Sequence, residues 1–139
     1  MTGRYDDRGM PLHWSISRRQ RLVKMHADGA VRLSDLEGFL HALASKNAFA
    51  YPKLFDARHG FTGMSESDVP TYAGMVSGYA TLSGFGPCAV IASRDSITSH
   101  RPLITQLMLG KRPLGIFSDM DDAERWLGVQ WEEWARPSR

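Results

Sequence analysis

Residues 87–92 read Pro-Cys-Ala-Val-Ile-Ala, and they carry the clearest indication of the fold class. From Cys88 to Ala92 it holds no charged or strongly polar side chain, so neither face of a strand built from it suits water. Such a strand is typical of a parallel sheet that helices cover on both faces. We expect it to be the central strand, with Cys88 as a small buried apolar side chain.

On the carboxyl side of this stretch, helix and strand patterns alternate. A helix is predicted from apolar residues at helical spacing, which are Leu103, Ile104, Leu107 and Met108. Residues 114–117 predict the last strand. Ser118 or Asp119 then caps a final helix. The buried side of that helix is predicted at Ala123, Trp126 and Leu127.

On the amino side, residues 51–56 predict a strand that ends at Asp56. A loop over residues 60–68 leads into a long helix that Gly84 and Gly86 end. The inward face of that helix is predicted at Val69, Tyr72, Ala73, Val76 and Ala80.

Further toward the amino terminus, residues 13–17 and 22–27 predict two short strands that form a hairpin, which Asp28 and Gly29 end. Ser34 and Glu37 have the spacing of a capping box, so a helix is expected to start there. Its buried face is predicted at Leu36, Phe39, Leu40, Leu43 and Ala44.

The order of these elements is strand, strand, helix, and then strand and helix three times over. It predicts the α/β class, with a mixed, mostly parallel five-stranded sheet and packed helices in a single domain. The length of 139 residues agrees with one domain. We expect the domain to span residues 13–128, with a flexible segment at residues 1–12 and a tail at residues 129–139.

Composition excludes several classes of protein. The net charge is +2, and the basic excess is confined to residues 1–32, which hold seven Arg or Lys against three Asp. A nucleic-acid binder is expected to carry a larger basic stripe. No apolar run approaches the roughly 18 residues of a membrane span, and a lone cysteine suggests a reducing compartment. We therefore expect a cytoplasmic protein without nucleic-acid or integral membrane association.

The ends of parallel strands meet at one edge of a sheet, where such folds bind ligands. Here that edge predicts a polar crevice formed by Asp56, Arg58, His59, Ser93 and Arg94. Asp56, His59 and a serine could form a nucleophile triad, but no Gly-x-Ser-x-Gly elbow is present. The five histidines never have the i, i+4 spacing of a zinc helix, so neither a metal nor another cofactor is expected.

Three stretches resemble the SpoIIAA-like proteins of the STAS superfamily, a fold also related to Sec14-type domains. They are residues 54–58, residues 88–92, and residues 115–117 leading to residues 123–127. The resemblance implies a non-enzymatic regulatory or protein-interaction module with a protein partner. It also implies a phosphorylation switch at Ser65, although Met64 and Glu66 differ from the neighbours that the family has there.

For Ser65 and Ser67, a plain helix cap is the alternative to the switch. Pro70 favours Ser67 as the cap, because a missing amide is harmless within the first turn of a helix. Glu66 and Asp68 would repel an added phosphate.

Two further features leave alternatives open. The face formed by Tyr72, Val76 and Tyr79 suits a core, or a carrier that holds a small apolar or anionic ligand beneath the helix. Trp131 and Trp134 either fold back onto the domain or form an aromatic patch for self-association into a homo-oligomer. A small hydrolase is the third hypothesis, after the interaction module and the carrier.

Overall fold

The computed structural model describes residues 10–83, 86–98 and 114–135. Its strands are β1 (Leu12–Ser17), β2 (Leu22–Val31), β3 (Lys53–Thr62), β4 (Cys88–Ile91) and β5 (Leu114–Phe117). Its helices are α1 (Leu33–Ser45), α2 (Asp68–Ser83) and α4 (Met120–Ala135), and residues 94–98 are also helical. The helix predicted from Leu103 to Met108 lies outside the described residues.

The five strands form one sheet in the order β1-β2-β3-β4-β5. β1 pairs with β2 antiparallel and every other neighbouring pair is parallel, which confirms the mixed, mostly parallel sheet. β4 is an interior strand with partners on both sides, but β3 and not β4 is the middle strand. Cys88 is half-buried, so the expectation of a buried thiol is wrong at the first residue of β4.

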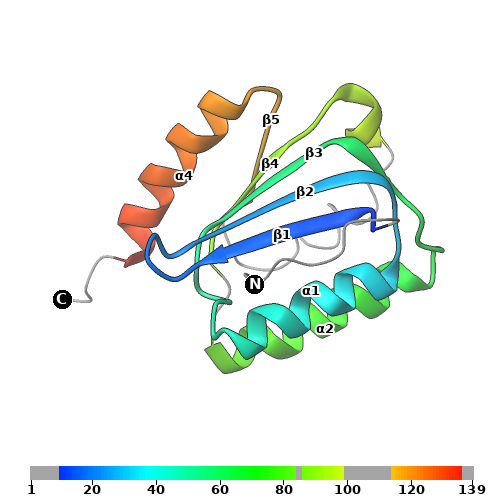
Figure 1. Cartoon of the computed structure of the whole chain (residues 1–139), viewed down its shortest axis with the longest axis horizontal. Coiled ribbons are helices and arrows are strands. Elements are labelled where there is room, and N and C mark those ends of the chain that lie inside the picture. The colour runs from blue at the N-terminus through cyan, green and yellow to red at the C-terminus, as the bar shows by residue number, and fades with distance from the viewer. Residues whose placement is uncertain (1–9, 84–85, 99–113, 136–139) are drawn as a thin grey trace.

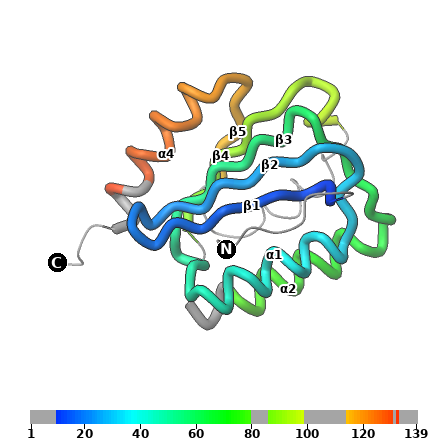
Figure 2. Tube along the Cα trace, in the orientation of Figure 1, coloured from blue at the N-terminus to red at the C-terminus, as the bar shows by residue number. Residues whose placement is uncertain are grey.

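Helices cover the sheet unequally on its two faces (Figure 1). α1 and α2 lie side by side on one face and α4 lies on the other, as the Cα trace also shows (Figure 2). Leu36, Phe39, Leu40 and Leu43 of α1 are buried as predicted, whereas Ala44 is exposed. On the other face, Ala123 and Leu127 of α4 pack against β3 and β4. The core is therefore thicker on the side of α1 and α2.

β2 continues through Asp28 and Gly29 to Val31, so the prediction that these residues end the strand is wrong. Gly29 has φ +99°, a conformation that glycine adopts without a steric penalty. Because the strand runs on, α1 begins at Leu33 and Arg32 is its N-cap. The amide of Arg32 donates to Asp35 Oδ2 at 2.8 Å, so Ser34 and Glu37 do not form the capping box.

β3 also exceeds its predicted end at Asp56 and continues to Thr62. β3 extends beyond β4, because the last residue of β4, Ile91, pairs with Asp56. Among the described residues, the part of β3 after Asp56 pairs only with the extension of β2. The expected loop at residues 60–62 is therefore strand. Local sequence did not indicate this because the extension is stabilised by pairing with a distant segment.

α4 extends to Ala135, past the domain end that we predicted at residue 128. Asp119 is its cap, since Asp119 Oδ1 accepts from the amide of Asp121 at 2.9 Å. Trp131 and Trp134 lie on this helix, but their side chains are outside the described part of the structure. None of the helices in the described ranges is long and apolar enough to span a membrane.

Candidate functional site

A row of polar side chains crosses three strands on the sheet face that carries α4. His13 of β1 pairs with His26 of β2, and His26 pairs in turn with Asp56 of β3. The row continues through Ile91 to Phe117 at the far edge. Because side chains alternate along a strand, the flanking residues Trp14 and Met25 belong to the opposite face.

The two imidazole rings of this row are stacked. Their centroids lie 4.6 Å apart and their planes differ by 15°. This spacing is close to the roughly 4.8 Å between neighbouring strands, so each ring stands above its own strand. His13 is only 9% exposed, whereas His26 is exposed. The ring of His26 is thus the member of the pair that solvent can reach.

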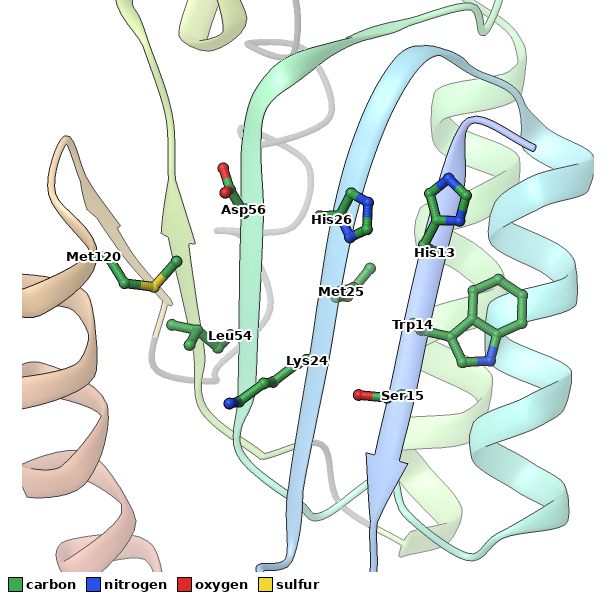
Figure 3. A pocket seen from close by; sticks show the side chains of 9 residues that line it. All are labelled: His13, Trp14, Ser15, Lys24, Met25, His26, Leu54, Asp56 and Met120. Atoms are coloured by element: carbon green, nitrogen blue, oxygen red, sulfur yellow. The ribbon is translucent and has the colours of Figure 1, made fainter. Parts of the chain in front are cut away.

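α4 packs on β3, β4 and β5, and among the described helices none packs over His13 and His26 on this face. This part of the sheet face holds a cavity of about 380 Å³, which we call the sheet-face hollow. Its lining includes His13, Ser15, Lys24, His26, Leu54, Asp56 and Met120. Figure 3 shows Met120 reaching toward the sheet from α4 and Trp14 pointing away toward α1. The hollow is therefore bounded by the histidines on one side and by α4 on the other.

The carboxylate of Asp56 is held by Arg58, two residues along the same strand. Arg58 Nε donates to Oδ1 at 2.9 Å and Nη2 donates to Oδ2 at 2.7 Å. This bidentate hydrogen bonding lowers the pKa of Asp56 from its ordinary value, against a smaller opposing effect of burial. Asp56 therefore enters the hollow as an ionised group whose charge is already paired.

A β-bulge places Arg58 beside this carboxylate. His26 pairs with Asp56 and Asp28 pairs with His59, so Ala57 and Arg58 oppose Ala27 alone. Ala57 is buried in the core, while Arg58 and His59 are both exposed. The extra residue lets two consecutive polar side chains reach solvent.

Lys24 supplies an uncompensated positive charge at the hollow. It lies two residues before His26 on β2, so the two side chains share a face. Among the described residues, no carboxylate forms an ion pair with Lys24. A second cavity, of about 690 Å³, adjoins the histidine pair near the start of α1, with Asp28, Arg32 and Asp35 in its lining.

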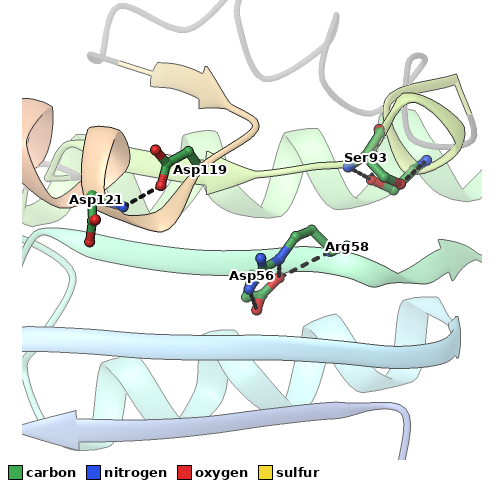
Figure 4. A network of polar contacts seen from close by, with 6 residues as sticks. Asp56, Arg58, Ser93, Asp119 and Asp121 are labelled. Carbon is green, nitrogen blue, oxygen red and sulfur yellow. Dashed lines mark hydrogen bonds and ion pairs between the residues drawn. The ribbon is translucent and has the colours of Figure 1, made fainter.

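The predicted polar crevice is only partly assembled. Asp56 and Arg58 form an ion pair, but they and His59 lie within β3 and not in a loop after it. Ser93 (Figure 4) exchanges hydrogen bonds with Ser96, whose amide donates to Ser93 Oγ at 3.1 Å. Arg94 is exposed. The described contacts of this set therefore join Asp56 to Arg58 and Ser93 to Ser96.

Ser65 caps α2, whereas Pro70 had favoured Ser67. The amide of Asp68 donates to Ser65 Oγ at 3.3 Å, and the amide of Ser65 donates to Asp68 Oδ2 at 3.1 Å. A turn at residues 66–67 precedes the α-helix, so Pro70 still falls within its first turn. Both serines are exposed, and a phosphate on Ser65 would meet the Asp68 carboxylate.

The possible apolar ligand face is part of the core. Tyr72 and Val76 are buried in the cluster that joins α1, α2 and the sheet. Tyr79 is partly buried and stacks on Phe49 with ring centroids 4.6 Å apart. Within the residues described, no group of three or more His, Cys, Asp or Glu side chains is arranged to hold a metal ion.

Sequence reasoning missed His13, Lys24, His26 and Met120. The pairing of the two histidines had a signal in the sequence. A four-residue connection at residues 18–21 places Ser17 opposite Leu22, and the same hairpin register places His13 opposite His26. Lys24 then follows on the same face. The contribution of Met120 had no signal in the sequence, since it depends on where α4 packs.

Comparison with known proteins agrees with the architecture. One solved structure similar to this chain is that of a protein of the DUF3478 family from Shewanella loihica PV-4, described as uncharacterised and as having a SpoIIAA-like fold. The match has a TM-score of 0.58 at 20% sequence identity and covers 84% of this chain and 93% of that one. No family model and no curated protein matches the sequence. The chain therefore has a SpoIIAA-like fold, which confirms the resemblance at the level of fold.

Proposed function

We propose that this protein is a non-catalytic binding module that holds a small molecule in the sheet-face hollow. The observation that carries the proposal is the row of His13, His26 and Asp56, which lines a cavity of about 380 Å³ beside the part of the sheet that α4 covers. Small-molecule sites are commonly cavities of about 300–1,000 Å³ with a few convergent polar groups.

The arrangement favours binding over catalysis. A general base must be able to reach the proton that it removes. Here the carboxylate of Asp56 is occupied by the Arg58 guanidinium, and the hydroxyl of Ser93 accepts from a neighbouring amide. The proposed ligand site therefore differs from the one expected at α2, whose inward face is part of the core. It lies on the opposite face of the sheet.

Native mass spectrometry of gently purified protein tests the proposal. We expect an added mass that leaves under denaturing conditions and that is lost in His26→Ala. His41→Ala is the matched control, because His41 is an exposed histidine on α1 outside the lining of the hollow. If His26→Ala keeps the added mass to the same extent as His41→Ala, the bound molecule does not lie in the hollow and the proposal fails.

Recognition of a protein partner through residues 58–68 is a second candidate function. It is favoured by Phe61, which is 51% exposed on the part of β3 that extends beyond β4. A pull-down with wild type, Phe61→Ser and Val129→Ser tests it, since Val129 is a comparably exposed residue on α4. A partner retained by Val129→Ser and lost by Phe61→Ser supports this surface, and identical partners for all three proteins argue against it.

A further inference from the structure

We infer that the small molecule is a flat aromatic anion, with its ring against the open face of His26 and its charge beside Lys24. This inference rests on the proposed function and names the chemical class of the ligand. It follows from three properties of the hollow: a stack of rings that stops at β2, a thioether on the opposite wall, and a positive charge without a partner.

The ring stack stops where the hollow begins. His13 and His26 stand above β1 and β2, and the next position in the row is the short side chain of Asp56. Asp56 is held by Arg58 of its own strand. Within the described residues, His13 is the only ring that stacks on His26. A flat ring placed above β3 would therefore continue the stack.

The opposite wall also suits an aromatic ring. Met120, the first residue of α4, is half-buried and packs against the cluster that contains Leu54. Figure 3 shows Asp56 and Leu54 lying between Met120 and His26. Sulfur–aromatic contacts are favourable, and methionine adapts its shape to the group that it contacts. The hollow thus has an imidazole on one side, a thioether on the other and Leu54 beneath.

The charged side chains that line the hollow favour a ligand with a negative charge. Asp56 is the acidic residue that lines the hollow, and Arg58 already neutralises it. Lys24 lies one side-chain position along β2 from His26 and forms no ion pair among the described residues. A cationic ligand would be repelled by Lys24, whereas a carboxylate or phosphate on the ring would pair with it.

Three small probes separate ring shape from charge. Benzoate is flat and anionic, benzamide is flat and neutral, and cyclohexanecarboxylate is anionic without a flat ring. Each is titrated into isotope-labelled full-length protein while the NMR signals of His26 and the amides of β2 and β3 are followed. We expect benzoate to bind at least tenfold more tightly than either of the other two, with shifts centred on His26 and Lys24.

Variants then assign the contacts. Lys24→Gln should weaken benzoate binding at least fivefold and leave benzamide unchanged, whereas His26→Ala should weaken both. Lys46→Gln is the matched control, because Lys46 is an exposed lysine at the end of α1. The dispersion of the NMR spectrum shows that each variant is folded.

Four outcomes would overturn the inference. Equal affinity for benzoate and benzamide would contradict the inferred negative charge of the ligand. An equal effect of Lys24→Gln and Lys46→Gln would contradict it as well. Equal affinity for benzoate and cyclohexanecarboxylate removes the flat ring. No shift at His26 with any probe removes the ligand class altogether. In each case a co-purified mass that depends on His26 would still support the proposed function, so the two failures are distinguishable.

Discussion

At the scale of single residues, Lys53 is a charged side chain placed inside the protein. It is 2% exposed, and its Nζ donates to the backbone carbonyls of Phe49 at 2.5 Å and Tyr51 at 2.7 Å. These carbonyls belong to the connection between α1 and β3. A buried carbonyl without a donor is destabilising, so Lys53 stabilises the path of this connection.

Replacing Lys53 with Met keeps most of the aliphatic stem and removes the donor. We expect Lys53→Met to lower the free energy of unfolding by about 1–3 kcal/mol, because the carbonyl of Tyr51 loses its donor and the carbonyl of Phe49, which also accepts from the amide of Gly86, loses its charged donor. Urea denaturation followed by circular dichroism measures it. Lys46→Met, at an exposed position, should change stability by no more than about 0.5 kcal/mol. Equal effects of the two substitutions would contradict this role.

Asp56 links stability to pH through its contact with Arg58. The hydrogen bond from Arg58 lowers the pKa of Asp56 in the folded protein. A lowered pKa in the folded state favours folding while the carboxylate is ionised, and this contribution is lost as the pH falls through the lowered value. Asp56 therefore contributes at neutral pH and not in strong acid.

Asp56→Asn should destabilise the protein at pH 7 by at most about 1 kcal/mol, since the pair is partly exposed to water. The difference from wild type should stay constant above about pH 5 and shrink below about pH 4, as the wild-type carboxyl becomes protonated. Urea denaturation of both proteins between pH 3 and pH 7 tests the sign. A difference that grows toward acid would exclude the proposed linkage.

At the scale of elements, β3 depends on close contact with β2. The two strands pair along most of their length, with a register shift between His26 and Asp28. Beyond this shift, Gly60 faces the core next to Ala27, and a Cβ added at Gly60 would lie 2.3 Å from the Cβ of Ala27. Only glycine fits here without displacing a neighbour.

Gly60→Ala should therefore lower the free energy of unfolding by about 2 kcal/mol through overpacking. Combined with Ala27→Gly, which removes the opposing methyl group, it should be less harmful than the sum of the single effects. Gly74→Ala is the control, since nothing lies within 4 Å of an added Cβ there. That change should stabilise α2 by about 0.5–1 kcal/mol. Additive effects at Gly60 and Ala27 would rule out their contact.

The boundaries of the helices and strands show which parts of the fold local sequence patterns could predict. The buried face of α1 and the strand at Leu114–Phe117 were predicted because a local periodicity marks them. The outer half of β3 was missed because Arg58, His59 and Gly60 have no strand-like pattern, and pairing with β2 makes them strand. Both Ser65 and Ser67 were predicted as possible caps, but Pro70 favoured Ser67, because the turn at residues 66–67 between Ser65 and the α-helix has no clear signal in the sequence.

At the scale of the molecule, the sheet separates two cores of unequal depth. The larger core packs α1 and α2 against β1, β2 and β3, whereas α4 contributes Ala123 and Leu127 to a smaller cluster. Stability is not uniform in such a structure, and thinner layers open more readily.

Hydrogen exchange measures this difference. Amides in the middle of α1 should exchange at least tenfold more slowly than those in the middle of α4, because opening α4 exposes less apolar surface. Native-state exchange followed by mass spectrometry resolves the two helices as separate peptides. Equal protection of α1 and α4 would mean that the two cores unfold together and would contradict the expected difference.

Periodicities within short segments of the sequence were enough to predict the order of the described elements, the mixed sheet and the buried residues Leu36, Phe39, Leu40 and Leu43 of α1. By contrast, contacts between distant segments place Asp56 beside His26, pair Arg58 with Asp56, and set the described part of α4 over β3, β4 and β5. The physical reason is that the register of parallel strands and the placement of a helix depend on contacts between segments far apart in the chain, which no local pattern encodes.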